Sequence, residues 1–539
     1  MFQQPLLDLE DDFLTIAEAA TFFSVSSATI RNWIKTGHLS LVERGKIAKS
    51  SILQFKEEQL GKHKLTGRAN KSQKDSHNHG QLSEVILNKL ASSDLNLIGS
   101  EYEAQLSNTY RNKEGIYYTP KDIVDDLLVT SEDISNKTFC DPCCGSGNFL
   151  IKAIELGFKP ENIYGFDVDP VAVEIARKRI EEKTGYQSMQ IRCQDFLKVL
   201  QEEHYQKYDY IYTNPPWGKK LEKNVKQQYA EKYKAGTSND TCALFFFACL
   251  SVLEKYGRLG LLLPEAFFNV ASYETARKKL LSYKIEALKD YGKAFKGLQT
   301  GAVAFVLQND QVNLADKINC LYRNNEFKRD ISSFINNPKS IINLNCDDSE
   351  AKVINYLYSK PYLTLENKAI WGLGIVTGDN KKYLKSKLAL GLIPVFKGSD
   401  ITKNGLKEPS HFISTDFSLY QQVAPLAIFE AKEKLVYKFI SSNLCFAYDN
   451  EQSYMLNSAN MVIVNKEFPI SMPILSQLMN SEIMNWLFNK LFNTYKVLRG
   501  DLEALPIFTQ YIDGNNFSEE DYLNLLNIEK YNGTFRIKT

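Results

Sequence analysis

The chain has 539 residues, of which 44% are hydrophobic and 12% aromatic, and its formal net charge is +1. At roughly 100–200 residues per domain, it is long enough for more than one domain with an apolar core. It has no run of about 18 apolar residues and begins with an acidic, polar stretch, so we expect neither a membrane span nor a signal peptide. We expect a soluble, cytoplasmic protein with no membrane partner and with its nine cysteines reduced. The net charge does not show whether the protein binds nucleic acid, because acidic residues elsewhere can balance the charge of a local basic cleft.

Residues 13–56 predict a small helical unit at the amino end. Thr15 is placed to cap the first helix, and Glu18, three residues later, completes a capping box. Residues 27–34 predict a second helix, and a short hairpin follows it. The pattern resembles the winged helix-turn-helix of MerR and excisionase proteins. Such a unit reads DNA or docks a partner protein, and the sequence leaves both roles open.

Residues 57–82 are polar and rich in Lys, Ser, His and Gly, which predicts a flexible linker. We expect the two linker histidines, His77 and His79, to be solvated. Residues 83–320 then alternate between strand-like and helix-like patterns, which is typical of an α/β unit. Residues 321–539 mix short strands and helices without a catalytic motif.

The segment FCDPCCGSGNFL at residues 139–150 predicts a strand, a glycine turn and the start of a helix. Gly145 and Gly147 by themselves are weak evidence, because the segment lacks both the third glycine of a dinucleotide site and the Gly-Lys-Ser/Thr of a phosphate loop. Cys140 and Cys143 have a zinc-like spacing. No second Cys or His pair follows at ligand spacing, so we expect no metal there.

Two further strands are predicted downstream, each ending in an acidic residue. The first ends at Asp167, which is placed to hold a ribose diol. Asp169 is better placed to cap the helix that follows it. The second strand, residues 189–192, is followed by Asp195 and Phe196, where a carboxylate would accept an adenine amine and a ring would cover the base.

The most informative motif is Asn214-Pro215-Pro216-Trp217, which follows an apolar, strand-like run at 208–213. Two prolines stiffen the turn and restrict the residue before each of them. The Asn side chain and the Pro215 carbonyl are therefore held where they can accept two hydrogen bonds from a planar amine. An aromatic ring beside them can stack on the heterocycle that carries the amine.

The rest of the α/β unit is predicted from apolar runs. Residues 242–253 predict a buried helix, and 258–264, 285–291 and 302–307 predict further strands. Phe295 lies between the last two strands.

In this order and spacing, the motifs of residues 100–310 resemble the S-adenosylmethionine-dependent DNA adenine-N6 methyltransferases. Residues 115–120, GIYYTP, resemble the first cofactor segment of that family. Cofactor motifs that precede Asn-Pro-Pro-Trp, with a recognition region last, match the γ arrangement. Residues 371–401 and 496–506 resemble parts of the TaqI-like recognition region. The resemblance implies a Rossmann-like α/β sheet between a small helical amino-terminal domain and a mixed α+β target-recognition domain at 321–539.

The resemblance also implies a set of site residues. The cofactor S-adenosylmethionine would be bound by Tyr118, Thr119, Pro120, Asp141, Pro142, Gly145, Gly147, Asp167, Asp195 and Phe196. Catalysis would fall to Asn214, Pro215, Pro216 and Trp217, with Trp217 and Phe295 on the two faces of the base. Lys219, Lys220, Lys223 and Lys226 would meet phosphates or form a solvated helix face.

The function implied is adenine-specific methylation of a defined double-stranded DNA sequence at a flipped-out base. Such an enzyme acts beside a separately encoded restriction endonuclease or alone. Asn-Pro-Pro-aromatic sites also methylate RNA amines and protein glutamine, and both alternatives stay open, although the recognition region favours DNA. A DNA-binding regulator with a decayed catalytic core is a further alternative, which the intact motifs disfavour.

Overall fold

The computed structural model describes residues 117–200, 206–219, 221–295, 298–512 and 516–538, together with residues 13–22, 30, 33–34, 39–43, 46–48, 50–52, 95, 98–99 and 101–102. The predicted linker at 57–82 lies outside the described residues, as do Lys220 and most of the predicted second helix at 27–34. Among the described residues, no helix is long and apolar enough to cross a membrane.

The amino-terminal unit contains helix α1 (Ile16–Phe22) and a three-stranded sheet of β1 (Phe13–Thr15), β3 (Lys46–Ala48) and β2 (Leu41–Glu43). The predicted capping box is confirmed, because the Thr15 amide donates to Glu18 at 2.8 Å and the Glu18 amide donates to Thr15 Oγ1 at 3.3 Å. Ile30 and Trp33, from the predicted second helix, are buried in a small core. The β2–β3 pair is the predicted hairpin.

A nine-stranded sheet forms the centre of the molecule, in the order β12-β11-β9-β10-β8-β7-β4-β5-β6. Its strands are β4 (Phe139–Asp141), β5 (Ile163–Asp167), β6 (Ile191–Cys193), β7 (Tyr208–Thr213), β8 (Leu253–Pro264), β9 (Tyr283–Gly292), β10 (Ala302–Gln311), β11 (Lys317–Tyr322) and β12 (Asn325–Asp330). Strands β8, β7, β4, β5 and β6 run parallel to one another, and β10 runs antiparallel between β8 and β9. The predicted Rossmann-like sheet is confirmed.

The sheet extends past residue 320, where the sequence placed a boundary. Strand β12 pairs with β11 in the register Lys317 with Asp330 to Tyr322 with Asn325. A tight turn with Arg323 at φ 57° joins the two strands. Residues 325–330 therefore belong to this sheet, because the hairpin is closed by backbone pairing that no sequence motif marks.

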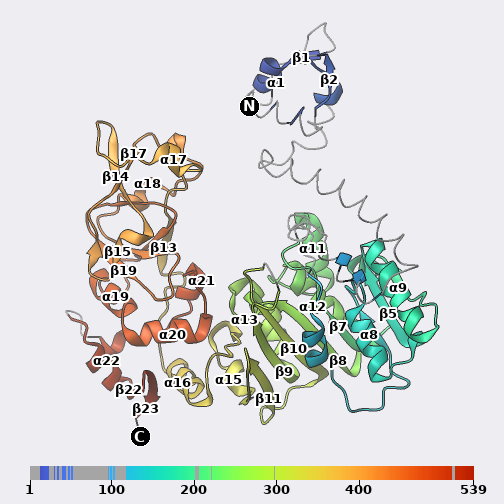
Figure 1. Cartoon of the computed structure of the whole chain (residues 1–539). Coiled ribbons are helices and arrows are strands. Elements are labelled where there is room, and N and C mark those ends of the chain that lie inside the picture. Colours follow the sequence, from blue (N-terminus) through green and yellow to red (C-terminus); the bar gives the residue numbers. More distant parts are fainter. Residues whose placement is uncertain are drawn as a thin grey trace.

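Helices cover the sheet (Figure 1). They are α7 (Lys121–Leu127), α8 (Asn148–Leu156), α9 (Pro170–Thr184), α10 (Phe196–Val199), α11 (Lys223–Lys232), α12 (Thr241–Ser251), α13 (Ala266–Asn269) and α14 (Glu274–Leu280). Helix α12 was predicted from its sequence, and its residues 241–249 are all buried. Such a helix, apolar on every side, belongs in a protein interior.

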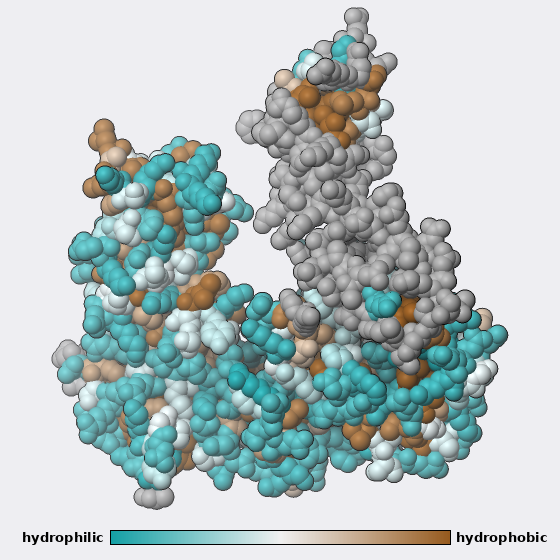
Figure 2. Space-filling view, viewed as in Figure 1, coloured by the Kyte–Doolittle hydropathy of each residue, from teal (hydrophilic) through white to brown (hydrophobic). Residues whose placement is uncertain are grey.

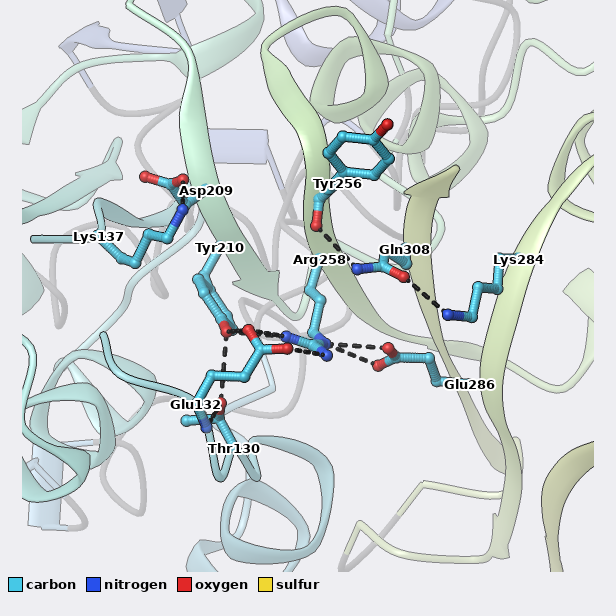
Figure 3. A network of polar contacts seen from close by, with 10 residues as sticks. All are labelled: Thr130, Glu132, Lys137, Asp209, Tyr210, Tyr256, Arg258, Lys284, Glu286 and Gln308. Carbon is cyan, nitrogen blue, oxygen red and sulfur yellow. Dashed lines mark hydrogen bonds and ion pairs between the residues drawn. The ribbon is translucent and has the colours of Figure 1, made fainter. Parts of the chain in front are cut away.

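At the end of the sheet away from the predicted cofactor motifs, a polar network joins strands β7, β8 and β9 to the loop before β4 (Figure 3). The Arg258 guanidinium donates to both oxygens of Glu132 at 2.7 and 2.8 Å, and its Nε donates to Glu286 at 2.9 Å. The Tyr210 hydroxyl also accepts from Arg258 at 2.9 Å. The hydrogen bonds from Arg258, and one that the Tyr210 hydroxyl donates at 3.0 Å, lower the pKa of Glu132 to about 2. The network links β7, β8 and β9 to a segment that lies 78 residues before Tyr210 and 126 residues before Arg258 in the chain.

The carboxyl-terminal part is a mixed α+β unit, as predicted. A four-stranded sheet has the order β13 (Ala369–Leu373), β21 (Ala459–Val464), β18 (Lys434–Lys438), β19 (Phe446–Asp449), and a smaller sheet has β17 (His411–Ser414), β14 (Leu392–Phe396) and β20 (Tyr454–Met455). The main helices are α16 (Asp348–Ser359), α19 (Met472–Met479), α20 (Glu482–Phe492), α21 (Arg499–Leu502) and α22 (Glu519–Leu525), followed by the hairpin of β22 (Ile528–Tyr531) and β23 (Thr534–Ile537). Two apolar clusters form its core.

Candidate cofactor and target-base site

A pocket opens at the carboxyl ends of β4, β5 and β7, where parallel strands of an α/β sheet commonly place a ligand. Its walls are formed by Tyr117, Tyr118, Thr119, Asp141, Pro142, Cys143, Cys144, Gly145, Asn148, Phe149, Asp167, Val168, Asp169, Pro170, Gln194, Asp195, Phe196, Leu197, Asn214, Pro216, Lys219, Leu221, Thr241 and Phe245. The sheet thus brings the predicted cofactor motifs and Asn214 to one cavity.

Five of the predicted site residues lie outside these walls: Pro120, Gly147, Pro215, Trp217 and Phe295. Pro120 and Gly147 stand at the N-caps of α7 and α8. Pro215 is buried behind the turn, and the two rings belong to an aromatic cluster beside the pocket.

The glycine turn brings the backbone close to an aromatic ring. Gly145 has φ +48°, and a Cβ at this position would lie 2.8 Å from the ring of Tyr118. A side chain would therefore need both an unfavourable backbone conformation and a displaced tyrosine. The Gly145 amide donates to Asp167 Oδ2 at 2.8 Å, which fixes the turn against the end of β5.

Two carboxyl groups of the pocket have strongly raised pKa values. Burial raises the pKa of Asp141 to about 7, and the neighbouring charge of Asp167 adds to this shift. Burial likewise raises the pKa of Asp167 to about 6. Asp167 accepts from the amides of Gly145 and Asp169, at 2.8 and 2.9 Å, so its remaining lone pairs are open to a ligand. Such a pair favours a ligand that carries positive charge and hydroxyl donors.

Two other acids of the pocket cap helices. Asp169 accepts from the amides of Val171 at 2.9 Å and Ala172 at 3.4 Å at the start of α9, as the sequence predicted. Asp195 accepts from the Leu197 amide at 3.0 Å at the start of α10 and stays half-buried. Phe196 is buried beside it.

The amide of Asn214 is held on one side only. Its Nδ2 donates to the carbonyl of Tyr117 at 2.6 Å. Its Oδ1 is buried and has no hydrogen-bond partner among the residues that the structure describes. Leaving a buried acceptor unsatisfied costs about 1–3 kcal/mol. The turn therefore presents an acceptor that a donor on a ligand would satisfy.

Trp217 and Phe295 do meet, but not as two parallel plates. Their ring centroids lie 5.2 Å apart at 87°, and Tyr117 lies 6.0 and 5.8 Å from them. Both rings are only 7% exposed. A base held between two rings needs about 7 Å between them, twice a van der Waals contact of about 3.5 Å. The structure therefore shows a closed arrangement, which a ring movement must open before a base can enter.

Sequence reasoning missed several residues of the site. Asn148 donates to the Thr119 carbonyl at 2.9 Å and so holds the 117–119 segment from the side opposite Asn214. Its place directly after Gly147 was the available signal. Tyr117 lies in the predicted GIYYTP segment, but its contacts with Asn214 and Phe295 were not predicted, since these residues are nearly a hundred or more positions away.

Comparisons with known proteins agree with this geometry. The N-6 DNA Methylase family model matches residues 93–336, a TaqI-like C-terminal specificity domain matches 393–507, and a helix-turn-helix domain matches 13–60. The Type II methyltransferase M.VspI of Vibrio sp. (strain 343) is 46% identical over 409 residues, which are 75% of this chain and 100% of that protein. The Type II methyltransferase M.CvrRI of Paramecium bursaria Chlorella virus XZ-6E is 23% identical, over 57% of this chain and 73% of that protein.

Among solved structures, the type IIL restriction–modification enzyme MmeI in complex with DNA has a similar fold. The TM-score is 0.50 at 13% identity, over 75% of this chain and 70% of that one. The 46% identity over the whole of a type II methyltransferase shows the family directly. The chain therefore belongs to the N-6 DNA methylase family and is a DNA methyltransferase that uses S-adenosylmethionine.

Proposed function

We propose that this enzyme methylates the N6 amine of an adenine that has been flipped out of a specific double-stranded DNA sequence. The observation that carries the proposal is the buried Asn214 Oδ1, which lacks a donor among the described residues and belongs to a residue in the wall of a pocket lined by cofactor motifs. An exocyclic amine supplies the missing donor. The bond from Nδ2 to the Tyr117 carbonyl keeps the amide from turning its NH2 group toward that amine.

The adenine amine is a poor nucleophile because its lone pair is delocalised into the ring. Asn214 Oδ1 and the Pro215 carbonyl would accept its two hydrogens and favour a tetrahedral nitrogen. The N6 lone pair then forms the new N–C bond, the C–S bond breaks with its electrons left on sulfur, and one N6 proton passes to water. Catalysis of this kind depends on positioning and oriented dipoles.

When bound, S-adenosylmethionine supplies a methyl group that is already activated by the positive charge on sulfur. The pocket fits this group, because ionised Asp141 and Asp167 gain a cationic neighbour that offsets the burial of their charges. We assign the ribose hydroxyls to Asp167, the methionine end to Asp141 and the Gly145 turn, and the adenine to Asp195 and Phe196. Trp217 and Phe295 would cover the faces of the target base once their edge-to-face contact opens.

We further propose that the enzyme is the modification methylase of a restriction–modification system and acts on cytoplasmic DNA, beside a separately encoded endonuclease. Single-molecule sequencing of DNA from a host that expresses the chain should show N6-methyladenine at one sequence. The same DNA should resist a nuclease that cuts there. A mark on cytosine would contradict adenine as the target. Unmodified DNA together with methylated RNA or protein glutamine would support the alternatives.

A further inference from the structure

A short antiparallel pair of segments, 439–441 with 495–497, joins two distant parts of the carboxyl-terminal unit; we call it the cleft ribbon. Ile440 lies opposite Lys496, with a backbone hydrogen bond of 2.9 Å on either side of the pair. Directly opposite residues of an antiparallel pair point to the same face, so Ile440 and Lys496 share a face. Tyr495, one position earlier, projects from the other face at the end of the ribbon.

The ribbon exposes large side chains on an anchored backbone. Ile440 is 64% exposed and Tyr495 is 75% exposed, whereas Val497 in the same strand is buried in the core. Burying such a side chain fully is worth about 1.5–3 kcal/mol. Lys496 is exposed and makes no ion pair within the part of the chain that the structure describes. One face of the ribbon thus combines an uncovered isoleucine with an available lysine, and Tyr495 is exposed at the end of the opposite face, which it shares with the buried Val497.

The ribbon lies against the catalytic unit. Just before it, the Phe492 carbonyl accepts from Asn269 at 2.6 Å, and just after it, a Cβ on Gly500 would touch Ala271 at 3.4 Å. Asn269 and Ala271 follow the carboxyl end of β8, the direct neighbour of β7, whose carboxyl end carries Asn214. The residues that flank the ribbon therefore contact the catalytic unit just beyond the carboxyl end of β8.

The space-filling view shows the surface hollowed above this junction, with an apolar patch on the wall formed by the carboxyl-terminal unit near α21 (Figure 2). A duplex that delivers a base to Asn214 would approach the carboxyl ends of β4, β5 and β7, and β8 is the direct neighbour of β7. A protein that covered the ribbon would block this approach. The lysine matches the charge of a phosphate backbone, so the observations favour DNA as the occupant.

We propose that the cleft ribbon enters the target duplex where the base leaves it, presenting Ile440 and Tyr495 to the neighbouring base pairs and Lys496 to a phosphate. The inference rests on the proposed function and deepens it. Extruding a base costs a few kcal/mol of stacking and pairing. Apolar side chains inserted between base steps offset such a cost by replacing part of the lost stacking. The ribbon would act on base extrusion, separately from methyl transfer at Asn214.

The test uses a duplex with the sequence found methylated in host DNA and a second duplex in which the target adenine is mispaired. Tyr495→Ala and Ile440→Ala should each slow single-turnover methylation of the paired duplex about tenfold, equivalent to about 1.4 kcal/mol. A mispaired base is already partly released, so the second duplex should restore the rate to near that of the unaltered enzyme. A duplex with 2-aminopurine at the target position should show less fluorescence with either variant.

Tyr531→Ala is the matched control, because Tyr531 is 48% exposed on the carboxyl-terminal hairpin β22–β23. It should behave like the unaltered enzyme on both duplexes. An equal loss on paired and mispaired DNA, an unchanged rate, or a change in oligomeric state by sedimentation would each overturn the proposal. Failure of the proposed function is distinguishable, since it would appear as absent adenine methylation by the unaltered enzyme.

Discussion

At the scale of single residues, the site is defined by an asymmetry in one side chain. The Asn214 side chain donates to the Tyr117 carbonyl, and its oxygen has no hydrogen-bond donor among the residues that the structure describes. Asn148 holds the same segment through the Thr119 carbonyl. The 117–119 segment thus fixes the orientation of the Asn214 amide and is itself a wall of the pocket.

Asn214→Ala removes the proposed acceptor for the target amine. Loss of one preorganised hydrogen-bonding group at a reaction centre typically lowers kcat about 10²–10³-fold, and we expect a loss of at least this size. Binding of S-adenosylmethionine, measured by calorimetry, should stay close to that of the unaltered enzyme. Near-normal turnover by this variant would show that the amine is held elsewhere.

Cofactor binding should depend on pH near neutrality. Burial raises the pKa of Asp141 to about 7 and that of Asp167 to about 6, from 3.8. Both carboxylates are ionised at pH 8, and only the ionised forms attract the positive charge of the cofactor. The dissociation constant should therefore rise as the pH falls through 7 and then through 6, and binding in that window should release protons.

Calorimetry in two buffers with different ionisation enthalpies measures this proton release. Asp141→Asn should remove the part of the release that occurs near pH 7.

The effect of pH on folding stability has the opposite sign to that of an ordinary carboxylate, whose pKa is lowered by folding. A raised folded-state pKa means that ionisation costs the ligand-free fold stability as the pH rises from about 4 to 7. The cofactor should thus raise the Tm more at pH 8 than at pH 6. A pH-independent affinity would separate these two acids from the cofactor.

At the scale of elements, Arg258 connects three strands to the loop before β4 (Figure 3). Arg258→Ala leaves Glu286, which is partly buried, without its cation. Because Glu132 is exposed and its ion pair is screened by solvent, we expect the free energy of unfolding to fall by only about 1–3 kcal/mol. Each kcal/mol corresponds to a fall of about 2–4 °C in Tm. Differential scanning calorimetry measures the shift.

The network also has a pH signature. The pKa of Glu132 is lowered to about 2 from 4.5, so its contribution to stability is complete above about pH 4.5 and is lost as the pH falls toward 2. Glu132→Gln should flatten this dependence and destabilise less than Arg258→Ala at pH 7. Both variants should keep methyl transfer at permissive temperature, because the network lies at the edge opposite the site. Loss of activity in the folded variants would show that the network affects the site.

At the scale of the whole molecule, two units are candidates for recognising the DNA sequence. The TaqI-like region follows the catalytic sheet and lies against it through Asn269 and Phe492. The helix-turn-helix precedes a predicted flexible linker, residues 57–82, whose root-mean-square span is about 25–30 Å. A unit tethered in this way raises local DNA concentration but does not set the register of one base.

Deleting residues 1–80 should therefore leave the methylated sequence unchanged and at most lower the rate at limiting DNA. Single-molecule sequencing of host DNA compares the two sequences, and kinetics at several DNA concentrations separates affinity from turnover. Methylation at a different or relaxed sequence would give the amino-terminal unit a part in specificity.

The sequence by itself determined the local structures and the family. The glycine turn, the caps at Thr15 and Asp169, the strands that end in acids and the Asn-Pro-Pro-Trp turn depend on residues a few positions apart, so short motifs encode them. Only the tertiary structure decided the pairing of Asn214 with Tyr117, the edge-to-face contact of Trp217 with Phe295, the place of β11 beside β9 and the place of the cleft ribbon. Each of these joins residues through the order of strands or the packing of two units, and no local pattern of residues records which distant segments meet.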